Sequence, residues 1–174
     1  SFLDFLVKSN KSEVWESEYF RLLVPCSYYP HKNLERVIGS LVFLKEKNSE
    51  LLSKLKLLFT IPKDSAAWLQ LYNLAKSKEV ELYIDSSGFV PNSKFAGLYV
   101  NSHAVICASL VESSTAVFPE AFLSKRPLLV SNRDFATELC GDAALYFDPL
   151  DEKSIADAIF EIVTNEPLRD ELVK

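Results

Sequence analysis

From residue 19 onward, short apolar runs alternate with segments in which apolar residues recur every three or four positions. The first pattern is typical of buried strands and the second of amphipathic helices. Strands are expected at 19–27, 54–62, 80–85, 103–109, 127–131 and 144–148. Helices are expected from about residue 33, over 64–78, over 92–100, from about 116 to 125, over 134–139 and from residue 151.

Strands that alternate with helices predict a parallel sheet covered on both sides. We therefore expect an α/β fold, a Rossmann-like doubly wound parallel sheet of about six strands with helices on both faces. The first 18 residues do not fit the alternation and are interpreted as a connecting segment (1–18), which leaves 19–174 as one domain.

Helix ends carry their own signals. Asn33 and Asp151 are expected to cap the helices that follow them, and Asp64 and Asp134 to begin two others. Gly141 is expected in a left-handed conformation at the end of a helix, because glycine reaches positive φ without steric cost.

Composition bounds the size and the partners of the chain. At 174 residues and 48% hydrophobic, it can build a real core. It has no methionine and stops within a helical pattern, so we expect a piece of a longer protein. The net charge of -5 argues against nucleic-acid binding, and any acidic ligand must be held locally.

Cysteine count and hydropathy bound the compartment. The three cysteines are widely spaced and are expected to be reduced, buried thiols. No apolar run approaches the roughly 18 residues that span a bilayer. These features favour a cytoplasmic location.

The segment after the fourth expected strand combines two carboxylates with hydroxyl groups. Pro119 is tolerated only in the first turn of a helix, so this helix should begin no earlier than about Ala116. That leaves Ser113, Ser114 and Thr115 as a loop at the carboxyl end of a strand. Its amides and hydroxyls could receive a phosphate.

A helix N-terminus contributes only about 0.3 to 1 kcal/mol to anion binding, so a diphosphate also needs a cation. Lys32, soon after the first strand, is expected at the same edge of the sheet. Glu120, in the first turn of the helix, could accept hydrogen bonds from both hydroxyls of a ribose. The same residues also have a structural interpretation, since most lysines are solvated and acidic residues favour a first helical turn.

Three sequence motifs help to choose between the binding and the structural interpretation of these residues. YYPHKNLERVI, ESSTAVFPEAFLSKRPLLVSN and GDAALYFDPLDEKSIADAI occur in this order, with seven residues between Glu112 and Glu120. Together they resemble the C-terminal domain of the GT-B retaining glycosyltransferases of the group 1 (GT4) family, over roughly 19–163.

The resemblance implies roles for particular residues. Glu112 would contact hydroxyls of the transferred sugar and Glu120 the donor ribose. Lys32 would neutralise the diphosphate, and both Glu112 and Lys32 would be catalytic. Phe89 and Val90 would line the base, and the loop from Ser113 to Ala116 would complete the donor site.

The resemblance also implies an activity and partners. The domain would bind a nucleoside-diphosphate sugar for transfer with retention, in cell-envelope polysaccharide or glycolipid synthesis, with no cofactor and no metal. An N-terminal acceptor domain is missing, so the isolated piece is expected to be inactive. Nucleic acid is not expected as a partner, and contact with the inner face of the membrane would come only through the absent domain.

Two departures from the family pattern keep alternatives open. Cys26 and Ser27 stand where the family commonly has an arginine, and Arg126 or Arg133 is a candidate replacement. The glycine-rich loop is replaced by serines and threonine, and Lys125 stands where a later turn has glycine. A sugar-nucleotide epimerase of similar build and a non-catalytic nucleotide-binding domain therefore remain alternative interpretations.

Overall fold

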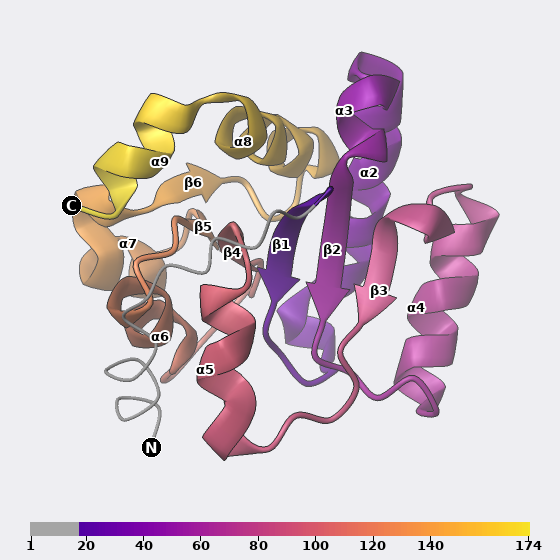
Figure 1. The fold of residues 1–174 in the computed structure, drawn as a ribbon, viewed down its shortest axis with the longest axis horizontal. Helices are drawn as coiled ribbons and strands as arrows, with labels where there is room; N and C mark the ends of the chain where they lie inside the picture. Colours follow the sequence, from indigo (N-terminus) through magenta and orange to yellow (C-terminus); the bar gives the residue numbers. More distant parts are fainter. Residues whose placement is uncertain (1–17) are drawn as a thin grey trace.

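The computed structural model of the protein describes residues 18–174, so the connecting segment expected at 1–18 lies almost entirely outside the described residues. The described part contains a six-stranded, all-parallel sheet with the order β3-β2-β1-β4-β5-β6 (Figure 1). The strands are β1 (Phe20–Val24), β2 (Leu55–Phe59), β3 (Ile84–Ser86), β4 (Ala104–Cys107), β5 (Leu128–Ser131) and β6 (Leu145–Phe147). This arrangement confirms the expected fold class.

Helices connect the strands and cover both faces of the sheet (Figure 1). The α-helices are α2 (Leu34–Lys47), α3 (Ser49–Ser53), α4 (Ala66–Ser77), α5 (Asn92–Val100), α6 (Val117–Leu123), α7 (Asp134–Cys140), α8 (Glu152–Thr164) and α9 (Glu166–Leu172). Three single turns of 3-10 helix are η1 (Pro30–Lys32), η2 (Glu81–Tyr83) and η3 (Gly141–Ala143).

Two cores lie on opposite faces of the sheet, because neighbouring residues of a strand point to opposite sides. In β1, Leu22 packs in a core with α2, α4 and α8, whereas Leu23 packs in a second core with α5, α6 and α7. Both side chains are fully buried. Burial of a leucine side chain contributes about 1.5 to 3 kcal/mol, so consecutive apolar residues such as Leu22 and Leu23 stabilise both layers.

Some expected element boundaries were wrong. The third strand was expected at 80–85, but η2 occupies its first half and β3 begins at Ile84. Glu79 adopts φ of 56° just before this turn, a left-handed conformation that a strand cannot include. Helix α4 is capped by Ser65 and not begun by Asp64, because the Ser65 side chain accepts a hydrogen bond from Trp68 N.

The other helix-end signals had mixed outcomes. Asp151 caps α8 as expected, since its carboxylate accepts a hydrogen bond from Lys153 N. Asp134 begins α7 as expected but does not cap it, because Arg133 occupies the cap position and makes no side-chain cap hydrogen bond. Gly141 has the expected positive φ of 50°, but its ψ of -126° lies outside the left-handed helical region.

Asn33 occupies the expected N-cap position of α2 but makes no cap hydrogen bond. It adopts φ of 59°, its Nδ2 donates to Pro149 O at 2.7 Å, and its Oδ1 accepts from Arg36. Asparagine tolerates this backbone better than most residues. Asn33 therefore ties the loop after β1 to the loop after β6 in place of capping the helix.

All three cysteines are free thiols; Cys107 and Cys140 are buried and Cys26 is half-buried. None of the helices formed by residues 18–174 combines the length and apolar character needed to cross a bilayer.

Candidate functional site

The order of the strands reverses direction between β1 and β4. The chain moves from β1 to β2 and β3 on one side, and β4 begins the other half of the sheet next to β1. In such folds, ligands bind at the carboxyl ends of the two strands where the order reverses. Register pairs Leu23 of β1 with Val105 of β4, so the loops that follow these strands emerge side by side.

These two loops bring Lys32 and Glu112 together. Lys32 ends η1 after β1, and its Nζ lies 2.5 Å from Oε1 of Glu112 in the loop after β4. The side chains are only 18% and 8% exposed, respectively. A backbone hydrogen bond of 2.8 Å from Leu110 N to His31 O joins the same loops. The structure thus places two of the expected site residues in direct contact at the reversal point.

Ser109 also belongs to this cluster, although the sequence analysis did not select it. Its hydroxyl donates to Oε1 of Glu112 at 2.6 Å, and the residue is 1% exposed. The Cys107 sulfur lies 3.6 Å from the same hydroxyl. In the sequence it is a small polar residue at the end of an apolar run, which is not a distinctive signal.

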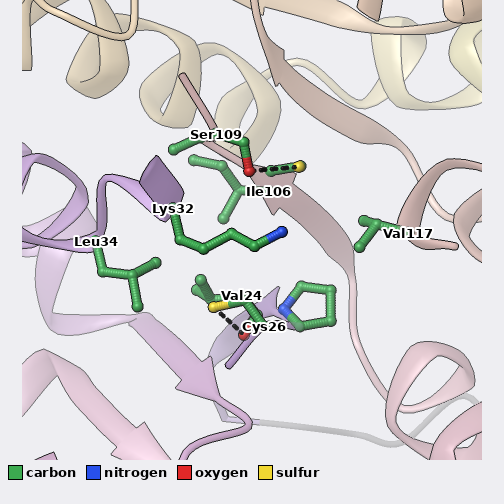
Figure 2. Close-up of a pocket in the computed structure, with 10 residues that line it drawn as sticks. Val24, Cys26, Lys32, Leu34, Ile106, Ser109 and Val117 are labelled. Carbon is green, nitrogen blue, oxygen red and sulfur yellow. Dashed lines mark hydrogen bonds between the residues drawn. The ribbon is translucent and has the colours of Figure 1, made fainter. Parts of the chain in front are cut away.

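A small pocket adjoins the Lys32 side chain. Figure 2 shows Lys32 extending between the β1 segment with Val24 and Cys26 and the β4 segment with Ile106 and Ser109. Its volume of about 10 Å³ is room for one water molecule. A larger ligand must therefore approach from the open side of the loops or displace the side chains that line this pocket.

Both thiols of this pocket are neutral. Burial raises the pKa of Cys26 to about 12, and the nearby Cys107 adds to that rise. Burial also raises the pKa of the Cys107 thiol. A protonated thiol is a poor nucleophile and carries no charge that would repel an anion. Cys26 is therefore uncharged. It does not replace the cation of the missing arginine, and it does not neutralise the Lys32 ammonium.

The hydroxyl loop between Glu112 and α6 is open to solvent. Ser113, Ser114 and Ala116 are exposed, and Thr115 is half-buried. The Thr115 hydroxyl accepts a hydrogen bond from Val117 N at 3.2 Å, so it already serves the first turn of α6. Within the described chain, the Ser113 and Ser114 hydroxyls make no hydrogen bond and stay available to a ligand.

Glu120 is half-buried one turn into α6 and makes no contact with Lys32 or Glu112 in the described residues. Burial raises the pKa of its carboxyl group, and a hydrogen-bonding interaction with Tyr99 of α5 partly offsets that rise. Glu120 thus stands apart from the ion pair, on the same connection that carries Glu112. Its carboxylate has no cationic partner among residues 18–174, which makes the charged form costly.

Phe89 and Val90 lie farther along the same edge of the sheet, after β3. Gly88 has φ of 71°, which directs the chain out of the strand, and Phe89 is 80% exposed. Because β3 is two strands from β1, its loop lies about 10 Å along the sheet from the loop of Lys32. The structure does not bring these two residues into contact with the Lys32–Glu112 pair.

Arg126 and Arg133, the candidate replacements for the missing arginine, lie at different edges. Arg126 donates to Val100 O at 2.9 Å, at the amino end of β4, so it cannot replace that cation. Arg133 follows β5 at the carboxyl edge, and its side chain makes no ion pair within residues 18–174.

Comparison with known structures shows the same architecture in larger proteins. An α,α-trehalose-phosphate synthase (UDP-forming) from Burkholderia vietnamiensis superposes with a TM-score of 0.78 at 12% identity, over 98% of this chain and 45% of that one. TarM from S. aureus gives 0.75 at 15% identity, over 90% and 31%. A glycosyltransferase from Rickettsia africae ESF-5 gives 0.74 at 16% identity, over 97% and 44%. The chain thus spans less than half the length of these proteins.

Sequence comparison gives the family. No protein of curated function matches the sequence significantly. The family model of the glycosyl transferases group 1 matches residues 8–174, nearly the whole chain. On that match, the chain belongs to the group 1 glycosyl transferase family.

Proposed function

We propose that this chain is the donor-binding half of a retaining glycosyltransferase of the GT4 type, which moves a sugar from a nucleoside diphosphate to an acceptor. The observation that carries the proposal is the meeting of Lys32 and Glu112 where the strand order reverses, 2.5 Å apart and largely shielded from water. A cation and a hydroxyl-binding carboxylate at this point suit the two ends of a sugar diphosphate.

Each residue has a chemical role in this proposal. When the bond between the sugar and the diphosphate loosens, negative charge develops on the leaving phosphate. The Lys32 ammonium stabilises that charge, and the exposed amides and hydroxyls of Ser113 and Ser114 donate to the same group. Glu112 accepts hydrogen bonds from the sugar hydroxyls and fixes the orientation of the ring. The acceptor then attacks from the face that the leaving group departs.

The remaining expected residues belong to the nucleoside. Glu120 binds the ribose hydroxyls, which add hydrogen-bond donors to the one that Tyr99 already gives its half-buried carboxylate. Phe89 and Val90 cover the base, and the exposed Phe89 ring offers a surface for stacking. One of the similar structures, TarM, holds UDP, which is consistent with a nucleoside diphosphate in this family.

A second domain supplies the acceptor, in the synthesis of a cell-envelope polysaccharide or glycolipid. The similar structures extend to more than twice the length of this chain, which leaves room for such a domain. We expect no turnover from this domain alone, because the acceptor half of the cleft lies elsewhere.

The test is a melting-temperature panel with UDP, GDP and ADP on this domain. A ligand that binds only the folded state raises the melting temperature. At a concentration one hundred times its Kd it adds about 2.7 kcal/mol to the free energy of unfolding. We expect one nucleotide to act clearly more strongly than the others, and Glu120→Ala to reduce its effect. If no nucleotide changes the melting temperature, the chain is a non-catalytic domain and the proposal fails.

A further inference from the structure

The two oxygens of the Glu112 carboxylate have unequal surroundings. Oε1 accepts from both Lys32 Nζ, at 2.5 Å, and Ser109 Oγ, at 2.6 Å. Oε2 makes no hydrogen bond or ion pair anywhere in the described part of the chain. Two donors, one from the connection after β1 and one from the loop after β4, therefore fix the carboxylate, and one oxygen is left for hydroxyls of a ligand.

The positive charge of Lys32 is balanced by a neighbouring carboxylate. Its one anionic partner among residues 18–174 is Glu112, so the pair is neutral as a unit. An approaching phosphate gains little from a cation whose charge is already compensated. The Lys32 side chain is only 18% exposed, so little of its ammonium is left for a second anion beside Glu112. Full contact between Lys32 and a diphosphate therefore requires Glu112 to leave.

Building on the proposed function, we propose that Glu112 is an internal competitor of the diphosphate for Lys32. Without a diphosphate, Glu112 forms the ion pair with the Lys32 ammonium, and the incoming diphosphate displaces the Glu112 carboxylate. Ser109 acts as a positioning residue that retains the displaced carboxylate at the sugar hydroxyls. After transfer, the nucleoside diphosphate carries no sugar, so Glu112 returns to Lys32 and favours release of the product.

Inorganic pyrophosphate tests this inference without knowledge of the base. Its affinity is measured by NMR titration for the wild type, Glu112→Gln, Lys32→Met and the double variant. We expect Glu112→Gln to bind pyrophosphate about tenfold more tightly, because the competing hydrogen-bonded charge is gone. Lys32→Met and the double variant should both lose binding, which shows that the gain acts through Lys32.

A matched control separates local competition from a general change of charge. Glu50→Gln removes the same charge from an exposed pair with Lys54 in the segment before β2, and we expect it to leave the affinity unchanged. Equal or weaker binding by Glu112→Gln overturns the inference. So does an equal gain in Glu50→Gln, or a gain that persists when Lys32 is replaced.

Ser109→Ala provides a second variant, in which the carboxylate stays but loses one of the two donors that fix it. We expect a gain of the same sign, about threefold, with wild-type circular dichroism. Unchanged pyrophosphate affinity in Ser109→Ala overturns its positioning role. The inference and the proposed function fail separately: absence of nucleotide binding by the wild type refutes the function, whereas nucleotide binding without a gain in Glu112→Gln refutes only the competition.

Discussion

The two edges of the sheet both hold cationic side chains, but their partners differ in kind. At the amino edge, Arg21 donates to Asn101 O at 2.7 Å and Arg126 to Val100 O at 2.9 Å. Arg169 donates to the last carbonyls of α8, at 2.8 and 3.0 Å. These acceptors lie at helix C-termini, where carbonyl groups lack partners and cations are stabilising. The arginines at the amino edge therefore stabilise the fold by satisfying the carbonyl groups at helix ends.

At the carboxyl edge, by contrast, the cation has a carboxylate partner from another loop. Lys32 and Glu112 satisfy each other across the point where the strand order reverses. A backbone carbonyl cannot leave its helix, whereas a side-chain carboxylate can yield to another anion. The comparison indicates that cations on carbonyl oxygens serve stability, whereas the cation paired with a side-chain carboxylate is the one that the proposed function assigns to binding.

The largest expected effect comes from the carboxyl edge. Lys32→Met should weaken nucleoside-diphosphate binding by about 1 to 3 kcal/mol, because a charge-assisted contact is lost. Isothermal titration calorimetry with the nucleotide that gives the strongest thermal shift measures this. Lys45→Met, which removes an exposed lysine paired with Glu79, is the matched control and should bind like the wild type. If Lys32→Met binds the nucleotide with wild-type affinity, the carboxyl edge is not part of the nucleotide-binding site.

The amino edge should respond in the opposite way. Arg126→Met keeps most of the apolar stem but loses the hydrogen bond to Val100 O. We expect the free energy of unfolding to fall by about 1 to 2 kcal/mol, because the carbonyl at the end of α5 loses its charged hydrogen-bond donor. Urea denaturation measures this loss, and nucleotide affinity should not change. Weaker nucleotide binding by a variant of undiminished stability would contradict the division between the two edges.

The sequence predicted the fold more completely than the site. Apolar runs bounded by turn residues located all six strands, because a strand buried on both faces leaves a continuous apolar signal. The boundary at β3 was wrong because the positive φ of Glu79 has no signature in the residue type. Local patterns placed Asn33 correctly at the N-cap position of α2 but could not show that its side chain bonds to Pro149, 116 positions away.

For the site, chain order placed Lys32 and Glu112 at one edge, because parallel strands end at the same edge. The contact itself depends on the lengths of two loops, which periodicity does not specify. Ser109 was missed because a small polar residue at the end of a strand has no distinctive pattern. Arg126 was a candidate replacement for the missing cation, yet it lies at the other edge, because it stands just before β5 and parallel strands begin at the amino edge.

A smaller effect is expected at the turn between α6 and β5, which lies at the amino edge just before β5 begins. Lys125 is exposed and adopts φ of 51°, a conformation that costs a residue with a Cβ about 1 to 2 kcal/mol. Lys125→Gly removes that strain but adds backbone entropy to the unfolded chain. We expect a net gain of about 0.5 to 1 kcal/mol in urea denaturation, whereas Lys125→Ala should not stabilise. Destabilisation by glycine would show that the lysine side chain contributes contacts that outweigh the strain.

The smallest effect is a pH dependence of stability below about pH 6.5 that arises at the amino edge. Burial lowers the pKa of His103 from its usual 6.5, and Arg21, Arg126 and Arg169 lower it further. The neutral ring accepts a hydrogen bond from Arg21 N at Nδ1, 2.9 Å away, which protonation would remove. The unfolded state therefore takes up the proton first, and the free energy of unfolding should decrease as pH falls below about 6.5.

Replacement of each histidine in turn assigns this slope. The protein has two histidines, and His31 lies at the carboxyl edge, stacked on Tyr29. His103→Asn should flatten the decrease in stability below about pH 6.5, measured by urea denaturation at several pH values, and His31→Asn should leave it in place. If His31→Asn flattens the slope and His103→Asn does not, the titrating group belongs to the carboxyl edge. The arginine-lined amino edge would then have no part in the acid sensitivity of the fold.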